Sequence, residues 1–296
     1  MERRPGLRIL IPPLAAKEAP YEAPHEAPHE APREAPQEAG EEAPSRRVRL
    51  VLEYDGTDFA GWQRQHNAPT IQGVLEDALA QITGERTHVG GAGRTDAGVH
   101  ALGQVASFIT RSRIDTAQLR RALCAVLPPG ISVVASDDVP LDFDARRHAR
   151  GKLYRYRIWN AESRSPLEAR FSWHRGRRLD DVAMAEAARC LVGEHDFSAF
   201  RASDCERKTT VRVIRRLEVI RSGALLCVEI EATAFLKNMV RVIVGTLVDV
   251  GRGRRHATEM ATILASGDRG RAGPTAPPTG LFLVRVHYDP PLPPRA

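Results

Sequence analysis

The chain has 296 residues, of which 42% are apolar and 27% are charged, enough for one large folded domain or two smaller ones. Its four cysteines form no Cys-x-x-Cys pair, and no apolar run reaches the roughly 20 residues of a membrane span. The composition therefore argues against a disulfide framework, a cysteine-based zinc site and a membrane-spanning protein. The net charge of +6 is uneven, because residues 17–44 carry −6 and residues 45–296 carry +10, which favours a polyanionic partner.

Residues 17–44 repeat the tetrad Glu-Ala-Pro-x. Proline at every fourth position removes helical hydrogen bonds, and the segment has almost nothing apolar to bury. We therefore expect residues 1–45 to be a disordered tail. The apolar run at 9–11 is too short and too close to prolines for a signal peptide, so we expect a cytoplasmic protein.

The folded part begins near Arg46, and its first half alternates strands with helices. Residues 48–54 alternate apolar and polar side chains as a half-buried strand does. Thr70 can cap a helix with apolar residues at helical spacing up to Ile82, which Gly84 ends. Further along we expect a strand over 105–109, a helix around 119–127 ended by Pro128-Pro129-Gly130, and a strand over 131–135.

The second half repeats this mixture. We expect a strand over 152–159, and then a helix that Asp180 caps and Gly193 ends. A hairpin of strands 211–220 and 225–232 follows, joined at Ser222-Gly223. The longest helix should cover 235–250 and end at Gly251, and a last strand should cover 281–286. This pattern predicts an α+β fold of two similar α/β lobes, residues 46–150 and 151–290. Their largely antiparallel sheets would be flanked by helices, with a central basic cleft between the lobes.

A glycine-rich stretch, residues 90–101, holds four glycines within nine positions, together with Arg94, Asp96 and His100. It lies between strand-like 87–89 and 105–109, so we expect a loop held by rigid elements. The loop is either a catalytic one or a plain turn in which Asp96 caps backbone amides. Asp96 alone fits a nucleophile, a general base or a metal ligand, and metal is least favoured because no second carboxylate or HxxxH pair lies nearby. Neighbouring arginines favour its ionised form, which suits a nucleophile.

At this point the chain is seen to resemble the tRNA pseudouridine synthase A (TruA) family. The resemblance covers roughly residues 46–290, and the tail 1–45 has no counterpart. It is carried by YDGTDFAGWQRQ (54–65), GRTDAGVHALGQVASF (93–108), KLYRYRIWN (152–160), GEHDFSAFR (193–201), FLKNMVRVIVGTLVDVGRG (235–253) and AGPTAPPTGLFLV (272–284). The chain departs from the family pattern directly after Phe143.

The resemblance implies an isomerase that converts uridine to pseudouridine at positions 38, 39 and 40 of the tRNA anticodon stem-loop, without a cofactor or a metal. Asp96 would be the nucleophile, attacking either C6 of the base or C1′ of the sugar. Arg241 matches the basic residue that pairs with it, although on residue pattern alone Arg241 also fits the edge of a solvated helix face. Tyr154 matches the tyrosine that stacks on the base. Arg94 would fill the space that the extruded nucleotide leaves and grip flanking phosphates.

The family also implies a homodimer with one tRNA across both subunits. Two sets of basic residues would supply affinity, with about half of each set facing RNA because side chains alternate along a strand. They are Arg146, Arg147, Arg150, Lys152, Arg155 and Arg157, and then Arg207, Lys208, Arg212, Arg215 and Arg216. Two alternatives remain: a non-catalytic tRNA-binding or chaperone protein that uses the same basic cleft, and a metal-assisted nuclease that uses Asp96.

Overall fold

The computed structural model describes residues 44–205 and 207–291. The expected tail, residues 1–45, lies almost wholly outside them. Contacts within the chain separate residues 1–41 from residues 42–296, and only the second of these units is described below.

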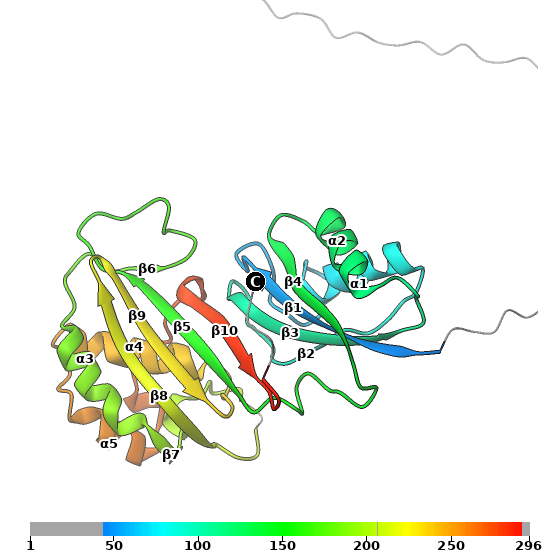
Figure 1. Ribbon diagram of the computed structural model, residues 1–296. Helices are drawn as coiled ribbons and strands as arrows, with labels where there is room; N and C mark the ends of the chain where they lie inside the picture. The colour runs from blue at the N-terminus through cyan, green and yellow to red at the C-terminus, as the bar shows by residue number, and fades with distance from the viewer. Residues whose placement is uncertain (1–43, 206, 292–296) are drawn as a thin grey trace, which may run out of the picture. The chain divides into compact units, whose positions relative to one another are not determined.

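One mixed β-sheet runs through this unit, in the order β4-β1-β3-β10-β5-β9-β8-β7, with β2 beside β3 and β6 beside β5 (Figure 1). Most neighbouring strands are antiparallel. The strands are β1 (Arg46–Tyr54), β2 (Gly90–Gly91), β3 (His100–Thr110), β4 (Ile131–Val139), β5 (Gly151–Trp159), β6 (Trp173–His174), β7 (Gly193–Asp196), β8 (Val211–Ser222), β9 (Leu225–Ala232) and β10 (Leu281–His287).

Strand β10 joins the two halves of the chain (Figure 1). Its residues Phe282 and Leu283 pair in parallel with His100 and Ala101 of β3. Its other edge pairs antiparallel with β5. The predicted α+β class is confirmed, but the expectation of a separate sheet for each half is wrong. Local sequence patterns do not reveal that one late strand pairs with both halves.

The helices are α1 (Ile71–Thr83), α2 (Thr116–Val126), α3 (Asp181–Ala188), α4 (Met239–Gly251) and α5 (Glu259–Ser266). Helix α2 contacts both α1 and β4, whereas α3 contacts α4, α5 and β8, and α4 lies against β5. Within the described residues, none of the helices is long and apolar enough to cross a bilayer.

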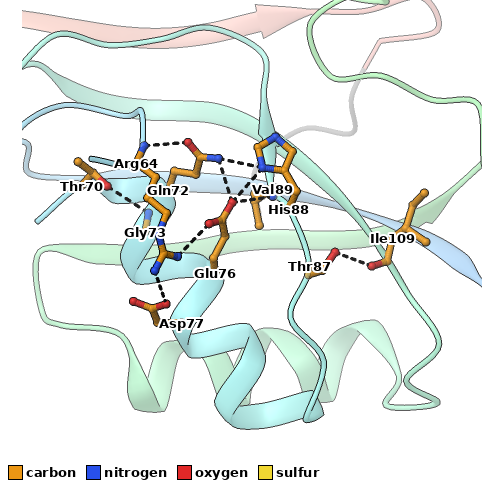
Figure 2. A network of polar contacts seen from close by, with 10 residues as sticks. All are labelled: Arg64, Thr70, Gln72, Gly73, Glu76, Asp77, Thr87, His88, Val89 and Ile109. Atoms are coloured by element: carbon orange, nitrogen blue, oxygen red, sulfur yellow. Dashed lines mark hydrogen bonds and ion pairs between the residues drawn. The ribbon is translucent and has the colours of Figure 1, made fainter. Parts of the chain in front are cut away.

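The signals predicted for α1 act as expected. The Thr70 hydroxyl accepts a hydrogen bond from the Gly73 N–H, and Gly84 ends the helix with φ of +74°. A polar network then fixes α1 to the segment before β2 (Figure 2). Glu76 accepts from the Val89 N–H at 3.0 Å and from Arg64 Nη1 at 3.0 Å. These hydrogen bonds fix the position of Val89, directly before the glycine-rich stretch.

Several predicted boundaries need correction. Helix α4 begins at Met239 rather than 235, because Asn238 adopts a left-handed conformation with φ of +60°. It includes Gly251 and, at 13 residues, only equals α1 in length. The glycine-rich stretch is not one loop, since 90–91 pair as β2 and β3 already begins at His100. β6, β7 and α5 were not predicted, the strands being short and α5 spanning two turns.

Candidate active site

Asp96 lies in the tight connection between β2 and β3, and hydrogen bonds fix the backbone around it. The Trp62 N–H donates to the Thr95 carbonyl at 3.0 Å, and the Val99 N–H donates to the Asp96 carbonyl at 3.1 Å. Gln104 Nε2, on β3, donates to the Gly93 carbonyl at 2.7 Å. The carboxyl group therefore projects from a rigid turn, with 40% of its side chain exposed.

Gly61 and Trp62 pack closely against this turn and the strand before it. Gly61 has φ of +91°, and a Cβ there would lie 2.6 Å from the Thr95 carbonyl oxygen. A Cβ on Gly91 would lie 2.5 Å from the Trp62 ring. Both approaches require glycine. Sequence reasoning gave these residues no role, although the Gly-Trp pair within 54–65 was a usable signal.

Tyr54, at the end of β1, holds the residue next to Asp96. Its hydroxyl lies 2.9 Å from Thr95 Oγ1, and both groups are buried. Burial raises the pKa of Tyr54 to about 12, so this phenol stays neutral as a hydrogen-bonding group. Sequence reasoning treated Tyr54 only as a strand residue.

Arg241 reaches Asp96 from the first turn of α4. Its Nη1 lies 3.3 Å from Asp96 Oδ2 and donates to Asn238 Oδ1 at 2.9 Å, while Nε donates to the Ala276 carbonyl at 2.7 Å. The Arg241 side chain is only 16% exposed. Arg241 is therefore not at the edge of a solvated face; it is a largely buried cation in contact with the carboxylate.

The partners of Arg241 are themselves fixed. A Cβ on Gly245 of α4 would lie 1.7 Å from the Pro274 carbonyl oxygen, so glycine allows the 274–276 segment to lie directly on the helix. The Ala276 N–H donates to the Arg241 carbonyl at 3.0 Å. This segment thus holds Arg241 through both its backbone and its guanidinium.

Tyr154 lies on β5 beside the same site. It is 8% exposed, and its ring meets Phe235 edge-on with centroids 4.9 Å apart. Burial, with smaller effects from Tyr54 and Asp96, raises the pKa of its hydroxyl. Tyr156, two positions along the strand, is fully buried and donates to the Pro277 carbonyl at 2.7 Å. Tyr156 is accordingly a core residue, and Tyr154 is the tyrosine of this strand on whose pKa Asp96 acts.

Arg94 lies two residues before Asp96 and is exposed. It makes no hydrogen bond or ion pair with any residue that the structure describes. Its charge contributes to lowering the pKa of Arg146. Burial is the largest cause of that shift, followed by repulsion from Arg207 and from Arg94. The structure thus brings Asp96, Arg241 and Tyr154 together, and places Arg94 toward a cluster of other cations.

His100, the imidazole of the glycine-rich stretch, does not join them. It is fully buried and stacked on Phe282 at 4.6 Å, and its Nε2 lies 3.1 Å from the Thr279 carbonyl oxygen. A carbonyl only accepts, so Nε2 carries the proton and Nδ1 accepts from the Gly56 N–H at 3.1 Å. Burial lowers the pKa of His100. The neutral ring fastens β3 to the start of β10.

The site consists of a rigidly held carboxylate, a largely buried guanidinium against it and an aromatic side chain alongside. No group of three or more histidine, cysteine or acidic side chains in the described part of the chain is arranged to hold a metal ion. Together with the charge of +10 on residues 45–296, the carboxylate, the guanidinium and the aromatic side chain fit an enzyme that modifies nucleic acid.

Comparison with known proteins identifies the reaction. The family model described as tRNA pseudouridine synthase matches residues 50–146 and 187–289. The tRNA pseudouridine synthase A of Myxococcus xanthus is 52% identical over 243 residues, which cover 82% of this chain and 92% of that protein. Those of Syntrophotalea carbinolica and Geotalea uraniireducens are 48% and 46% identical, with 82% of this chain and 96% and 100% of theirs covered. The chain belongs to the TruA family and is an isomerase with tRNA pseudouridine synthase A activity.

Proposed function

We propose that this enzyme isomerises uridine at positions 38, 39 and 40 of the tRNA anticodon stem-loop, with Asp96 as the nucleophile. The observation that carries the proposal is the contact of 3.3 Å between Arg241 Nη1 and Asp96 Oδ2, with Tyr154 beside it. A carboxylate needs no redox partner for this reaction. The N1–C1′ bond breaks, a C5–C1′ bond forms, the hydrogen on C5 leaves as a proton, and N1 gains one, so atoms and charge balance.

Each residue has a physical task in this scheme. The Arg241 guanidinium holds the Asp96 carboxylate in position before it attacks C6 or C1′. The face of Tyr154 stacks on the extruded uracil, which is worth about 1–3 kcal/mol per base. Extrusion itself costs a few kcal/mol. Exposed Arg94 occupies the space left in the helix and contacts the flanking backbone.

The two halves of the chain supply different parts of this site. Residues 46–150 contribute Asp96 and Arg94, whereas residues 151–290 contribute Tyr154 and Arg241. We propose that they act as a catalytic lobe and a completing lobe, with the RNA bound in a basic cleft between them. We further propose a cytoplasmic homodimer that binds one tRNA across both subunits, which sedimentation with and without tRNA would test.

The test is the release of tritium from tRNA labelled at C5 of uridine. Asp96→Asn should abolish release while leaving the dissociation constant for tRNA within a few fold, because the amide keeps the shape but is not nucleophilic. Mapping pseudouridines in the product then assigns the positions. Wild-type turnover by Asp96→Asn would refute the role of Asp96.

A non-catalytic tRNA-binding protein is the alternative from another class. It would bind tRNA without releasing tritium, in the wild type as well as in Asp96→Asn. A nuclease would instead shorten the RNA and lose activity in EDTA, so the same incubations separate the three functions.

A further inference from the structure

The basic residues of the two sets do not all face the same way. Along β5, Lys152, Tyr154 and Tyr156 share one face of the sheet, because alternate side chains point the same way. Arg155 and Arg157 therefore lie on the opposite face. Lys152 is the residue of β5 that places a cation next to Tyr154.

Basic residues on the opposite face are already neutralised within the protein. Arg155 Nε donates to Glu229 at 2.7 Å, and Arg157 Nη2 donates to Glu168 at 2.8 Å. Arg216 makes a second contact with Glu229, at 3.2 Å. Paired charges of this kind add little net attraction for a phosphate.

Lys152 is in a different environment. Its side chain runs beneath the backbone of the Asp96 turn, since a Cβ on Gly93 would lie 3.2 Å from Lys152 Cε and 3.7 Å from Nζ. Gly93 directly precedes Arg94 and is three residues from Asp96. Lys152 has no hydrogen-bond or ion-pair partner among residues 44–205 and 207–291. A half-buried ammonium without such a partner is unfavourable.

Within residues 44–205 and 207–291, the charged groups that affect Lys152 are cations. Burial, and then repulsion from Arg146 and Arg207, lowers the pKa of Lys152 to about 8. Arg94 adds its charge beside Arg146. Asp144 is the acidic neighbour of Arg146. The Oδ1 atom of Asp144 already accepts hydrogen bonds from the backbone N–H groups of Arg146 and Arg147, at 2.9 and 2.7 Å. Among the residues that the structure describes, the cluster of Arg94, Arg146, Lys152 and Arg207 thus carries an excess of positive charge to which an anion can bind.

We infer that Lys152, flanked by Arg94, Arg146 and Arg207, binds a phosphodiester that adjoins the uridine presented to Asp96. This inference rests on the proposed function, because it takes Tyr154 as the base-stacking residue. Lys152 and Tyr154 are two residues apart on one strand, about 7 Å, so one nucleotide can contact both. The bound phosphate neutralises the Lys152 ammonium next to Gly93. It thereby fixes the position of the RNA backbone, and with it the target uridine, relative to Asp96.

The first experiment measures binding of an anticodon stem-loop RNA over a series of salt concentrations, in an Asp96→Asn background that prevents turnover. Lys152→Met keeps the aliphatic part of the side chain but removes the charge. It should weaken binding about tenfold and lower the slope of log K against log salt by about 0.7–0.9. The matched control is Arg155→Met, from the same strand, which leaves Glu229 its contact with Arg216 and should change neither quantity.

The second experiment identifies the phosphate. Neutral methylphosphonate linkages are placed singly on either side of the target uridine. One of them should weaken binding to the Lys152 protein about tenfold and have no further effect on Lys152→Met, whereas the other should act equally on both. Unchanged affinity and salt slope in Lys152→Met, or equal penalties from both linkages in both proteins, would overturn the inference. Because these are binding measurements, failure here is distinct from failure of Asp96 in the tritium assay.

Discussion

Replacing Lys152 by methionine should stabilise the folded protein at neutral pH, although the same change weakens RNA binding. The pKa of Lys152 falls from its ordinary value of 10.5 to about 8, chiefly through burial and then through Arg146 and Arg207. Each pKa unit corresponds to about 1.4 kcal/mol. Holding the ammonium inside therefore costs the folded state about 3 kcal/mol at pH 7, which methionine would recover.

The effect has a defined pH dependence. Between pH 8 and 10.5 the unfolded chain keeps the Lys152 proton that the folded chain has lost, so this group makes the wild type more stable as pH rises through that window. Below pH 8 both states are protonated and the full penalty is present. The advantage of Lys152→Met should thus be greatest at pH 7 and should vanish toward pH 10.5.

Urea unfolding of both proteins at pH 7, 8, 9 and 10 would measure this difference, since titrations that the two proteins share cancel. Repeating the pH 7 pair in high salt should reduce the gain in part, because repulsion from exposed Arg207 is screened. A variant that is less stable than the wild type at pH 7 would refute the reasoning. So would a gain that stays constant up to pH 10, because it would reflect packing rather than charge.

Three further changes test the support of Asp96. Arg241→Lys should lower kcat roughly tenfold or more, because one ammonium cannot replace both Nε and Nη1; wild-type kcat would remove Arg241 from the site. Gly61→Ala should destabilise the fold by about 1–3 kcal/mol and impair catalysis, because the alanine Cβ would collide with the Thr95 carbonyl. Thermal unfolding measures the loss of stability and tritium release measures the loss of activity. A variant unchanged in both would contradict the packing described. Tyr54→Phe should cost about 1–2 kcal/mol by freeing the buried Thr95 hydroxyl, and equal urea midpoints would argue against that hydrogen bond.

The sequence predicted most of the elements, because their signals are local. Thr70 and Gly84 bound α1 as expected, and β8 and β9 form the predicted hairpin, although its turn is Gly223-Ala224 rather than Ser222-Gly223. The start of α4 was misplaced, because nothing in the residue pattern required Asn238 to be left-handed. The single sheet was also missed, because parallel pairing of β10 with β3 joins segments about 180 residues apart.

The same holds for the site: its local features could be predicted from the sequence, whereas its contacts between distant residues could not. Asp96 and Arg241 are separated by 145 positions, and only the resemblance to a family linked them before their contact was seen. Alternation along β5 indicated that half of its basic residues would face the RNA. It did not indicate which half, because that depends on α4 lying against one face of the strand. The sequence had placed Lys152 in a set with Arg155 and Arg157, and only the structure distinguished it from them.

The position of β10 bears on when the enzyme becomes competent during translation. Residues 46–280 can begin to fold as they leave the ribosome, but the parts of β3 and β5 that pair with β10 lack this partner until residues 281–287 emerge and insert between them. We expect Arg241 and Asp96 to be held in contact only once β10 is in place. A nascent chain that lacks this strand should therefore bind tRNA through its positive charge without modifying it.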